Sequence, residues 1–195
     1  MAQDSSLPEF WDTRYRDHVM PWDAGRVPAD LRAFAATLPD GAHILIPGCG
    51  SAHELRYLAE TGADVVAIDF SPQAIELGKR NAGPFADRIR FADFFQLDPG
   101  AQPFDVVYER AFLCALPRKL WPRYAARMAD LLGPGQRLAG FFFYGDSPRG
   151  PPFGTSPEEL HGLLDSAFEL VEDRSASESL AVFEGGERWQ VWRRR

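Results

Sequence analysis

The stretch that decides the fold is His43–Asp69, with the sequence HILIPGCGSAHELRYLAETGADVVAID. It begins with a short apolar run, His43–Pro47, that stops at a glycine-containing turn, which is typical of a buried strand. The segment Ser51–Thr61 then carries apolar residues at helical spacing and ends at Gly62, a residue favoured at helix C-caps. A second apolar run, Ala63–Ile68, follows. Strand, helix and strand in about 30 residues predict a βαβ unit, which requires parallel strands and a right-handed crossover.

The alternation of strands and helices continues toward the C-terminus. Ser71 and Pro72 predict a helix start, because serine caps helix N-termini and proline fits the first turn. Gly133-Pro134-Gly135 is expected to stop a later helix. The elements expected in this region are a helix from Ser71 to about Asn81, strands over Ile89–Phe91, Phe104–Tyr108 and Arg137–Tyr144, and helices over Pro117–Leu132 and from Thr155 or Ser156 to about Phe168.

The two ends of the chain depart from this alternation. The segments Glu169–Arg174 and Glu187–Trp192 alternate apolar and polar residues and flank a glycine-containing polar stretch, which predicts an antiparallel strand pair. Residues 1–41 precede the first strand and predict one or two added helices. We therefore expect a single α/β domain over residues 1–195, with a core over 42–195 built on a mainly parallel sheet with helices on both faces.

The composition restricts the classes of protein to which this chain can belong. The 195 residues are 45% hydrophobic and 25% charged, so one core can form without disulfides. The formal net charge of −7 repels nucleic-acid phosphates, which disfavours a nucleic-acid substrate. Cys49 and Cys114 have no partners at metal-ligand spacing, so no metal site is expected. The N-terminus lacks a signal-peptide pattern and no apolar run approaches about 18 residues, so we expect a cytoplasmic protein without a membrane segment.

A candidate cofactor site follows the first strand. Gly48 and Gly50 would let a ligand approach backbone N–H groups and a helix N-terminus, although glycines also form tight turns for steric reasons alone. Asp69 lies 19 residues after Gly50, about the offset at which an acidic side chain meets a ribose diol; it could instead cap the next helix. A dinucleotide-binding site requires a third glycine at the position where this chain has His53. This favours S-adenosylmethionine, which has no pyrophosphate, over nicotinamide or flavin cofactors.

Asp93-Phe94, at the end of the third expected strand, fits such a nucleoside site. The carboxylate would accept a hydrogen bond from the adenine amino group, and the phenyl ring would form a wall of the ring site. Phe94 could equally be a core residue only.

These features together resemble a known family. The run Ile46–Gly50 (IPGCG), the strand-end Asp69, Ala92–Phe95 (ADFF) and the C-terminal strand pair resemble class I S-adenosylmethionine-dependent methyltransferases, and more narrowly the thiopurine S-methyltransferase superfamily. Further motifs resemble its thiol, thiocyanate and halide methyltransferase branch. These are Trp11, Tyr15, Pro21–Arg26 (PWDAGR), Phe112–Ala115 (FLCA) and Gly150–Phe153 (GPPF). The resemblance spans about Phe10–Phe168.

The resemblance implies a Rossmann-like class I methyltransferase fold with a seven-stranded sheet, S-adenosylmethionine as cofactor, and residues 1–41 as a helical lid extension. The implied reaction is methyl transfer to a small sulfur or other soft anionic nucleophile. The cofactor contacts assigned on this basis are Trp11, Tyr15, Trp22, Gly48, Gly50, Asp69, Phe70, Asp93, Phe94 and Glu109. The acceptor contacts assigned are Arg110, Tyr144 and Phe153.

Arg110 is the residue that bears on the acceptor. An arginine follows the acidic residue in thiopurine enzymes, as Arg110 follows Glu109 here. The thiol and halide branch commonly has a tyrosine at this position. A permanently charged guanidinium at the end of a central strand would hold an anion. Its other interpretation is an ion pair with Glu109 or another carboxylate that only fixes a loop. An ionised nucleophile needs no general base, so no catalytic histidine is assigned.

Other classes stay open at this stage: a nicotinamide-dependent oxidoreductase, a methyltransferase for a non-sulfur small molecule, and a binding module without catalysis. A nucleic-acid methyltransferase would usually carry an Asn/Asp-Pro-Pro-aromatic motif where this chain has Glu109–Phe112. The sequence leaves the acceptor and the oligomeric state undetermined.

Overall fold

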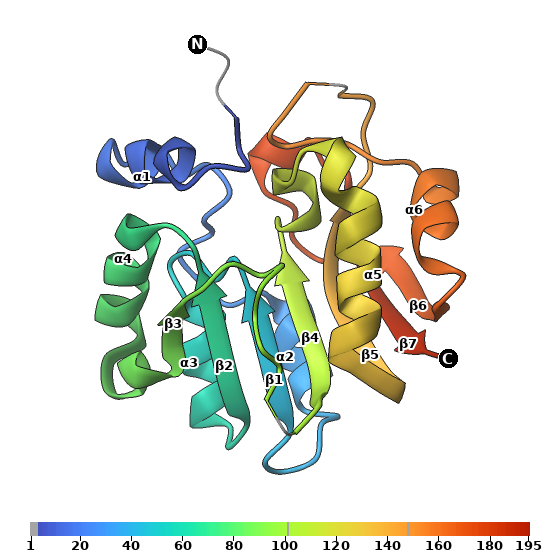
Figure 1. Cartoon of the computed structure of the whole chain (residues 1–195), viewed down its shortest axis with the longest axis horizontal. Coiled ribbons are helices and arrows are strands. Elements are labelled where there is room, and N and C mark those ends of the chain that lie inside the picture. The colour runs from blue at the N-terminus through green and yellow to red at the C-terminus, as the bar shows by residue number, and fades with distance from the viewer. Residues whose placement is uncertain (1–3, 101, 148) are drawn as a thin grey trace.

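A twisted sheet with helices on both faces forms the centre of the molecule (Figure 1). The computed structural model describes residues 4–100, 102–147 and 149–195. Within these residues the seven strands lie in the order β3-β2-β1-β4-β5-β7-β6. Their bounds are β1 His43–Pro47, β2 Asp64–Asp69, β3 Ile89–Phe91, β4 Phe104–Arg110, β5 Leu132–Phe143, β6 Phe168–Ser175 and β7 Glu187–Arg194. The first five are mutually parallel, and β7 runs antiparallel to both β5 and β6. The predicted fold class is confirmed.

The helices form where the sequence periodicity predicts them, with shifted ends. Their bounds are α1 Pro8–Arg16, α2 Ala29–Ala35, α3 His53–Glu60, α4 Pro72–Ala82, α5 Trp121–Leu131 and α6 Pro157–Leu164, and the 3₁₀ turns are η1 Gly83–Arg88, η2 Leu113–Ala115, η3 Arg118–Leu120 and η4 Ala181–Phe183. Ser71 caps α4 by accepting a hydrogen bond from the Ala74 N–H at 3.2 Å. Ser156 caps α6 in a capping box with Glu159. Helix α6 ends at Leu164, earlier than predicted, because β6 begins soon afterwards.

Strands β4, β5, β6 and β7 are all longer than the sequence pattern predicts, β6 and β7 by only one or two residues at an end. Strand β4 extends to Arg110, which pairs with Phe141 of β5. Strand β5 begins at Leu132 and runs through Gly133–Gly135, a run we expected to lie between elements. A register shift between Phe104 and Val106 in the β4–β5 ladder absorbs the extra residues of β5. The extension of β4 matters for the site, because it fixes which side of the sheet each of its last residues faces.

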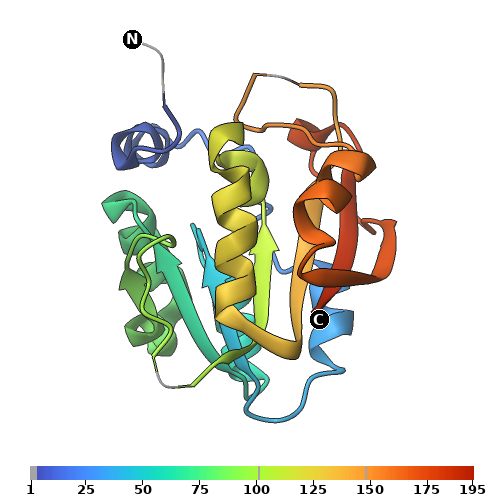
Figure 2. The ribbon, with the colours of Figure 1, turned by 45° about the vertical axis from the view of Figure 1, so that its right-hand side comes forward.

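The sheet buries apolar side chains on both faces. Helices α5 and α6 cover one face (Figure 2), and α2 and α3 cover the other (Figure 1). Neighbouring strand residues point to opposite faces, so Trp189 and Trp192 of β7 enter different core clusters, and both are fully buried. This two-sided burial holds the carboxyl ends of β1, β2 and β4 together at one edge of the sheet, and α1 lies above the part of this edge next to β2 and α4 (Figure 1).

The N-terminal extension has two parts with different surroundings. Helix α1 lies beside α4, and Asp12 accepts hydrogen bonds from Ser71 Oγ at 2.5 Å and from the Gln73 N–H at 3.1 Å. Helix α2 instead buries Leu31 and Phe34 in the core under the sheet. The segment 1–41, expected as one lid, is therefore divided, and its residues 1–3 lie outside the described residues. None of the described helices has the length and apolar character needed to cross a lipid bilayer.

Candidate functional site

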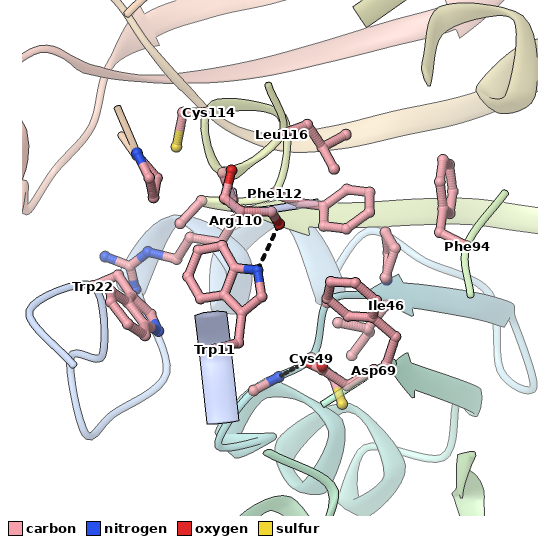
Figure 3. A pocket seen from close by; sticks show the side chains of 18 of the residues that line it. Trp11, Trp22, Ile46, Cys49, Asp69, Phe94, Arg110, Phe112, Cys114 and Leu116 are labelled. Atoms are coloured by element: carbon pink, nitrogen blue, oxygen red, sulfur yellow. Dashed lines mark hydrogen bonds between the residues drawn. The ribbon is translucent and has the colours of Figure 1, made fainter. Parts of the chain in front are cut away.

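A cavity of about 630 Å³ lies at the carboxyl ends of β1, β2 and β4, under α1 and the loop that follows it (Figure 3). Ligands of open α/β sheets bind at this edge, and the volume suits a small-molecule site. Of the residues assigned from the sequence, the lining includes Trp11, Tyr15, Trp22, Gly48, Gly50, Asp69, Phe70, Asp93, Phe94 and Arg110. Their contact with a cofactor or acceptor stays a prediction.

Asp69 ends β2 with its carboxylate buried beside the glycine turn. Its Oδ2 accepts a hydrogen bond from the Gly50 N–H at 3.0 Å, and its Oδ1 accepts one from the Ser71 N–H at 2.9 Å (Figure 3 shows the first). Burial raises the pKa of Asp69 to about 6, against the lowering effect of these N–H groups. Ser71, not Asp69, caps α4. Each carboxylate oxygen keeps further acceptor capacity, so the group fits a ribose diol.

Gly48 and Gly50 are required by close approach of side chains. Both have positive φ, at 59° and 51°. A Cβ at Gly48 would lie 2.6 Å from the Phe112 ring, and one at Gly50 would lie 2.6 Å from Tyr15 Oη. The turn is therefore tight for steric reasons and also faces the cavity. The approach of Tyr15 brings α1 into direct contact with it.

Three aromatic side chains of the N-terminal extension form one wall of the cavity. Trp11 and Trp22 meet edge to face with ring centroids 5.3 Å apart, and Tyr15 meets Trp22 in the same way at 6.1 Å. The Trp11 Nε1–H donates to the Ser5 carbonyl at 2.8 Å, which fixes that indole. Because Asp12 of the same helix is bonded to the start of α4, this wall is held against the core.

The loop after β3 contributes the opposite wall. The Asp93 carboxylate accepts hydrogen bonds from the Phe95 N–H at 2.9 Å and from Gln96 Nε2 at 2.7 Å. Phe94 is buried and meets Phe112 edge to face at 5.0 Å. Phe94 thus belongs to the core and lines the cavity at once, so the two interpretations of this residue are compatible.

Arg110, the last residue of β4, points into the cavity from its central strand (Figure 3). Its Nε lies 3.7 Å from Glu187 Oε1, and its guanidinium lies 4.7 Å from the centre of the Phe141 ring. Both charged side chains are nearly inaccessible, with exposed fractions of 9% for Arg110 and 2% for Glu187. The partner of Arg110 is therefore Glu187 of β7 and not Glu109. Glu187 is in turn fixed by the Leu180 N–H at 2.8 Å.

Glu109, Tyr144 and Phe153 are not among the cavity-lining residues, contrary to the sequence assignment. Glu109 lies on the other face of β4 from Arg110. Its Oε2 accepts hydrogen bonds from the N–H groups of Phe112 and Leu113 at 2.9 and 3.1 Å, and burial raises its pKa to about 7. Tyr144 Oη accepts a hydrogen bond from Gln190 Nε2 at 2.8 Å. In the 150–153 run, the side chains at the cavity are Pro151 and Pro152.

A polar group that the sequence assignment missed also lines the cavity, at the start of α3. His53 Nε2 lies 3.4 Å from Asp23 Oδ1, and Ser51 Oγ donates to Asp23 Oδ2. Burial would raise the pKa of Asp23, but hydrogen bonds from His53, Ser51 and the Gly25 N–H outweigh it and lower that pKa to about 2. The hydrogen bond with Asp23 raises the pKa of His53. The only sequence signal was position: Asp23 follows Trp22, and His53 stands where a dinucleotide site has glycine.

Comparisons with known proteins agree with this geometry. Residues 6–195 match the family model of thiopurine S-methyltransferase. The chain is 31% identical over 186 residues to thiopurine S-methyltransferase of Xanthobacter autotrophicus, with 84% of this chain and 86% of that protein covered. It is 28% identical over 202 residues to probable thiol methyltransferase 2 of Arabidopsis thaliana, covering 100% of this chain and 88% of that protein. Thiocyanate methyltransferase 1 of Brassica oleracea is 29% identical, with 94% and 84% covered.

Solved structures share the fold at lower sequence identity. Magnesium protoporphyrin IX methyltransferase of Synechocystis superposes with a TM-score of 0.75 at 16% identity, covering 98% of this chain and 99% of that chain. A didemethyltoxoflavin N1-methyltransferase of Burkholderia thailandensis gives 0.72 at 23% identity, with 96% and 87% covered. The resemblance drawn from the motifs is confirmed by the family match, which covers nearly every described residue. This chain belongs to the thiopurine S-methyltransferase family and is an S-adenosylmethionine-dependent methyltransferase.

Proposed function

We propose that the protein methylates a small, soft anionic nucleophile, such as a thiolate, a thiopurine, thiocyanate or a halide, held beside Arg110. The observation that carries this proposal is the position of the Arg110 guanidinium, a permanent positive charge at the same cavity as Asp69. Its ion pair with Glu187 is long, at 3.7 Å, and no described residue accepts a hydrogen bond from its guanidinium, whose Nε is buried. The guanidinium therefore keeps donors for an anion.

The order of strands supports the placement of the two reactants. Asp93 follows β3 and Asp69 ends β2, so the nucleoside of the cofactor would lie over that side of the edge. Gly48–Gly50 follows β1 and Arg110 ends β4, which places the reacting centre over the middle of the sheet. When bound, S-adenosylmethionine supplies an electrophilic methyl group on a positively charged sulfur. The residues present fit this cofactor, since a buried carboxylate, an aromatic wall and a glycine turn occur in the order that its parts require.

The chain itself contributes orientation and a dry site. Attack of an anion on a sulfonium methyl is an in-line displacement in which opposite charges cancel, so low polarity speeds it and no general base is needed. Trp11, Tyr15 and Trp22 would exclude water, and their ring faces favour a nearby cation. Arg110 would hold the anion in line. We restrict the lid role to α1 and the loop that follows it, because α2 packs in the core.

The names of the relatives support the acceptor class, since they include thiol, thiocyanate and thiopurine methyltransferases. The net charge of −7 favours a small-molecule acceptor over a nucleic acid. We also place the enzyme in the cytoplasm, because Cys49 and Cys114 are both free thiols, as a reducing compartment would keep them.

A methyl-transfer screen with radiolabelled cofactor tests the proposal. Hydrogen sulfide, an alkyl thiol, 6-mercaptopurine, thiocyanate and iodide should include at least one good acceptor, whereas an amine, a phenol and an oligonucleotide should be poor. Transfer only to amines or oxygen nucleophiles would refute the proposed acceptor class. Failure to transfer a methyl group to any acceptor, without binding of the cofactor, would refute the activity itself.

Arg110→Met separates acceptor binding from cofactor binding, because it keeps the stem and removes the charge. We expect the kcat/KM for an anionic acceptor to fall about 10- to 100-fold, roughly 1.4–2.7 kcal/mol of transition-state stabilisation. The affinity for S-adenosylhomocysteine should change much less. Arg56→Met, on the outer surface of α3, is the matched control and should leave both quantities unchanged. Weak cofactor binding with normal acceptor kinetics at saturation would mean that Arg110 serves the cofactor or the fold.

A further inference from the structure

Among the residues that the structure describes, four carboxylates line the cavity: Asp23, Glu54, Asp69 and Asp93. Three of them are already engaged by the protein. Asp23 is bonded to Ser51, His53 and the Gly25 N–H. Asp69 accepts from two backbone N–H groups, and Asp93 accepts from a backbone N–H and from Gln96.

Glu54 is the fourth carboxylate, and it has fewer partners within the protein than the other three. It is the second residue of α3, directly beyond the glycine turn. Its carboxylate interacts with its own backbone N–H, and no other described residue donates a hydrogen bond to it or forms an ion pair with it within 4 Å. Burial raises its pKa, and Arg110 and His53 are the cations whose charges act on it. Arg110 has its own counter-ion in Glu187, so Glu54 is a carboxylate without a dedicated cation.

The position of Glu54 identifies the kind of group that it would meet. Asp93 and Asp69 mark the nucleoside end of the cavity, and Glu54 lies at the other end, within electrostatic range of Arg110 and Tyr108 of β4. The amino-acid part of the cofactor would extend to that end. Its α-ammonium group loses hydration on entry, and a buried cation requires a carboxylate partner. The turn Ile46–Gly50 has no charged side chain to supply one.

We propose that Glu54 binds the α-ammonium group of the cofactor and so positions its amino-acid part against the start of α3. This inference rests on the proposed use of the cavity as the cofactor site. It assigns the ammonium to a carboxylate that has no hydrogen-bond or ion-pair partner outside its own residue among those described, and it leaves Arg110 for the acceptor. Asp69 and Glu54 would then hold the two ends of the cofactor, with the sulfur between them.

The experiment compares two ligands that differ in the amino-acid part. S-adenosylhomocysteine has the ammonium group and no sulfonium, and 5′-methylthioadenosine keeps the nucleoside and thioether but has no amino acid. Calorimetry with Glu54→Gln should show S-adenosylhomocysteine binding weakened about 10- to 100-fold, as expected for loss of a charge-assisted hydrogen bond. Binding of 5′-methylthioadenosine should change less than about twofold, because no contact to the nucleoside is removed.

Matched variants make the result specific. Glu60→Gln removes a carboxylate from the exposed end of the same helix, where it pairs with Arg56, and should leave both affinities unchanged. Glu54→Asp keeps the charge and should restore part of the loss for S-adenosylhomocysteine. Asp69→Ala should weaken both ligands alike, because both keep the ribose. Circular dichroism and thermal melting establish that each variant is folded, and Glu54→Asp provides the measurement if Glu54→Gln is not.

Other outcomes would overturn the inference. Equal weakening of both ligands would place Glu54 at the nucleoside or in the fold, and no weakening of either would remove it from the site. Weakened binding of S-adenosylmethionine with normal binding of S-adenosylhomocysteine would assign Glu54 to the sulfonium instead. A wild-type protein that binds neither ligand would refute the proposed cofactor site itself, a result distinct from all of these.

Discussion

At Asp69, burial and hydrogen bonding act in opposite directions on one carboxylate. Burial favours the neutral acid and raises the pKa to about 6, while the N–H groups of Gly50 and Ser71 favour the ionised form. The group is therefore ionised at neutral pH and faces a cavity where it can accept further hydrogen bonds. A carboxylate in this state is a strong acceptor for ribose hydroxyls.

Asp69→Ala should weaken S-adenosylhomocysteine binding by about 1–3 kcal/mol, because the ribose hydroxyls lose a charge-assisted acceptor. Isothermal titration calorimetry measures this directly. Asp64→Ala, at the exposed start of the same strand, serves as the control and should bind normally. Unchanged affinity in Asp69→Ala would exclude Asp69 from the nucleoside site.

The surroundings of Arg110 allow this residue to serve both the fold and the site. The sequence leaves open whether Arg110 meets an anion or only a neighbouring carboxylate. In the structure it has a buried counter-ion, Glu187, and still lines the cavity. The counter-ion lowers the cost of burying the guanidinium, and no described residue accepts a hydrogen bond from it, so its donors stay available. A structural ion pair and an acceptor site are therefore compatible at Arg110.

At the scale of elements, the loop after α1 is attached to the start of α3 by Asp23. Asp23 bonds Ser51 and His53, and its neighbour Trp22 forms part of the aromatic wall. The pKa of Asp23 is lowered and that of His53 is raised, so their pairing stabilises the folded state when both are charged. For Asp23 this contribution is lost as the pH falls toward about 2. For His53 it is present below its unfolded pKa of about 6.5 and is lost as the pH rises through its higher folded value.

His53→Gln should therefore lower the free energy of unfolding by about 0.5–1 kcal/mol at pH 6, and by less at pH 8.5. Urea denaturation at the two pH values measures the difference. Asp23→Asn should remove the same pH dependence, and the double variant should show that the two losses are not additive. An equal effect of His53→Gln at both pH values would show that its charge does not contribute to the attachment.

At the scale of the whole molecule, the cavity is closed by a segment that is not part of the sheet layers. Helix α1 meets the core through Asp12 at the start of α4 and through Tyr15 at Gly50. Helix α2, by contrast, fills the core with Leu31 and Phe34. Removal of the first part should open the cavity, whereas removal of the second would expose the core.

Deletion of residues 1–26 should therefore leave a folded protein that binds S-adenosylhomocysteine roughly tenfold or more weakly and transfers no methyl groups, because the aromatic wall is lost. Circular dichroism, calorimetry and the radiolabel assay provide the three measurements. A longer deletion, of residues 1–35, should lose the folded state as well. Full turnover by the shorter truncation would refute the lid role of Trp11, Tyr15 and Trp22.

Much of the molecule follows from local sequence. Apolar periodicity predicts the parallel strands, and the Ser71-Pro72 pair predicts the start of α4, because both depend on neighbouring residues only. The order of short motifs identifies the family. The sequence does not predict the hydrogen bond between the Gly50 N–H and Asp69, but the βαβ unit that it does predict brings these two strand ends together.

Other features depend on which residues the fold brings together. Strand β4 continues to Arg110, so the alternation of side chains turns Glu109 away from the cavity. The sequence pattern ends this strand at Tyr108 and therefore does not reveal which way Glu109 faces. Arg110 meets Glu187 because β7 lies beside β5 in the sheet, and Asp23 meets His53 because α1 docks above the carboxyl ends of the strands. Local sequence determined the elements and the family of this protein. Tertiary packing decided the charge partners at its site, since such pairs join distant segments and have no periodicity to reveal them.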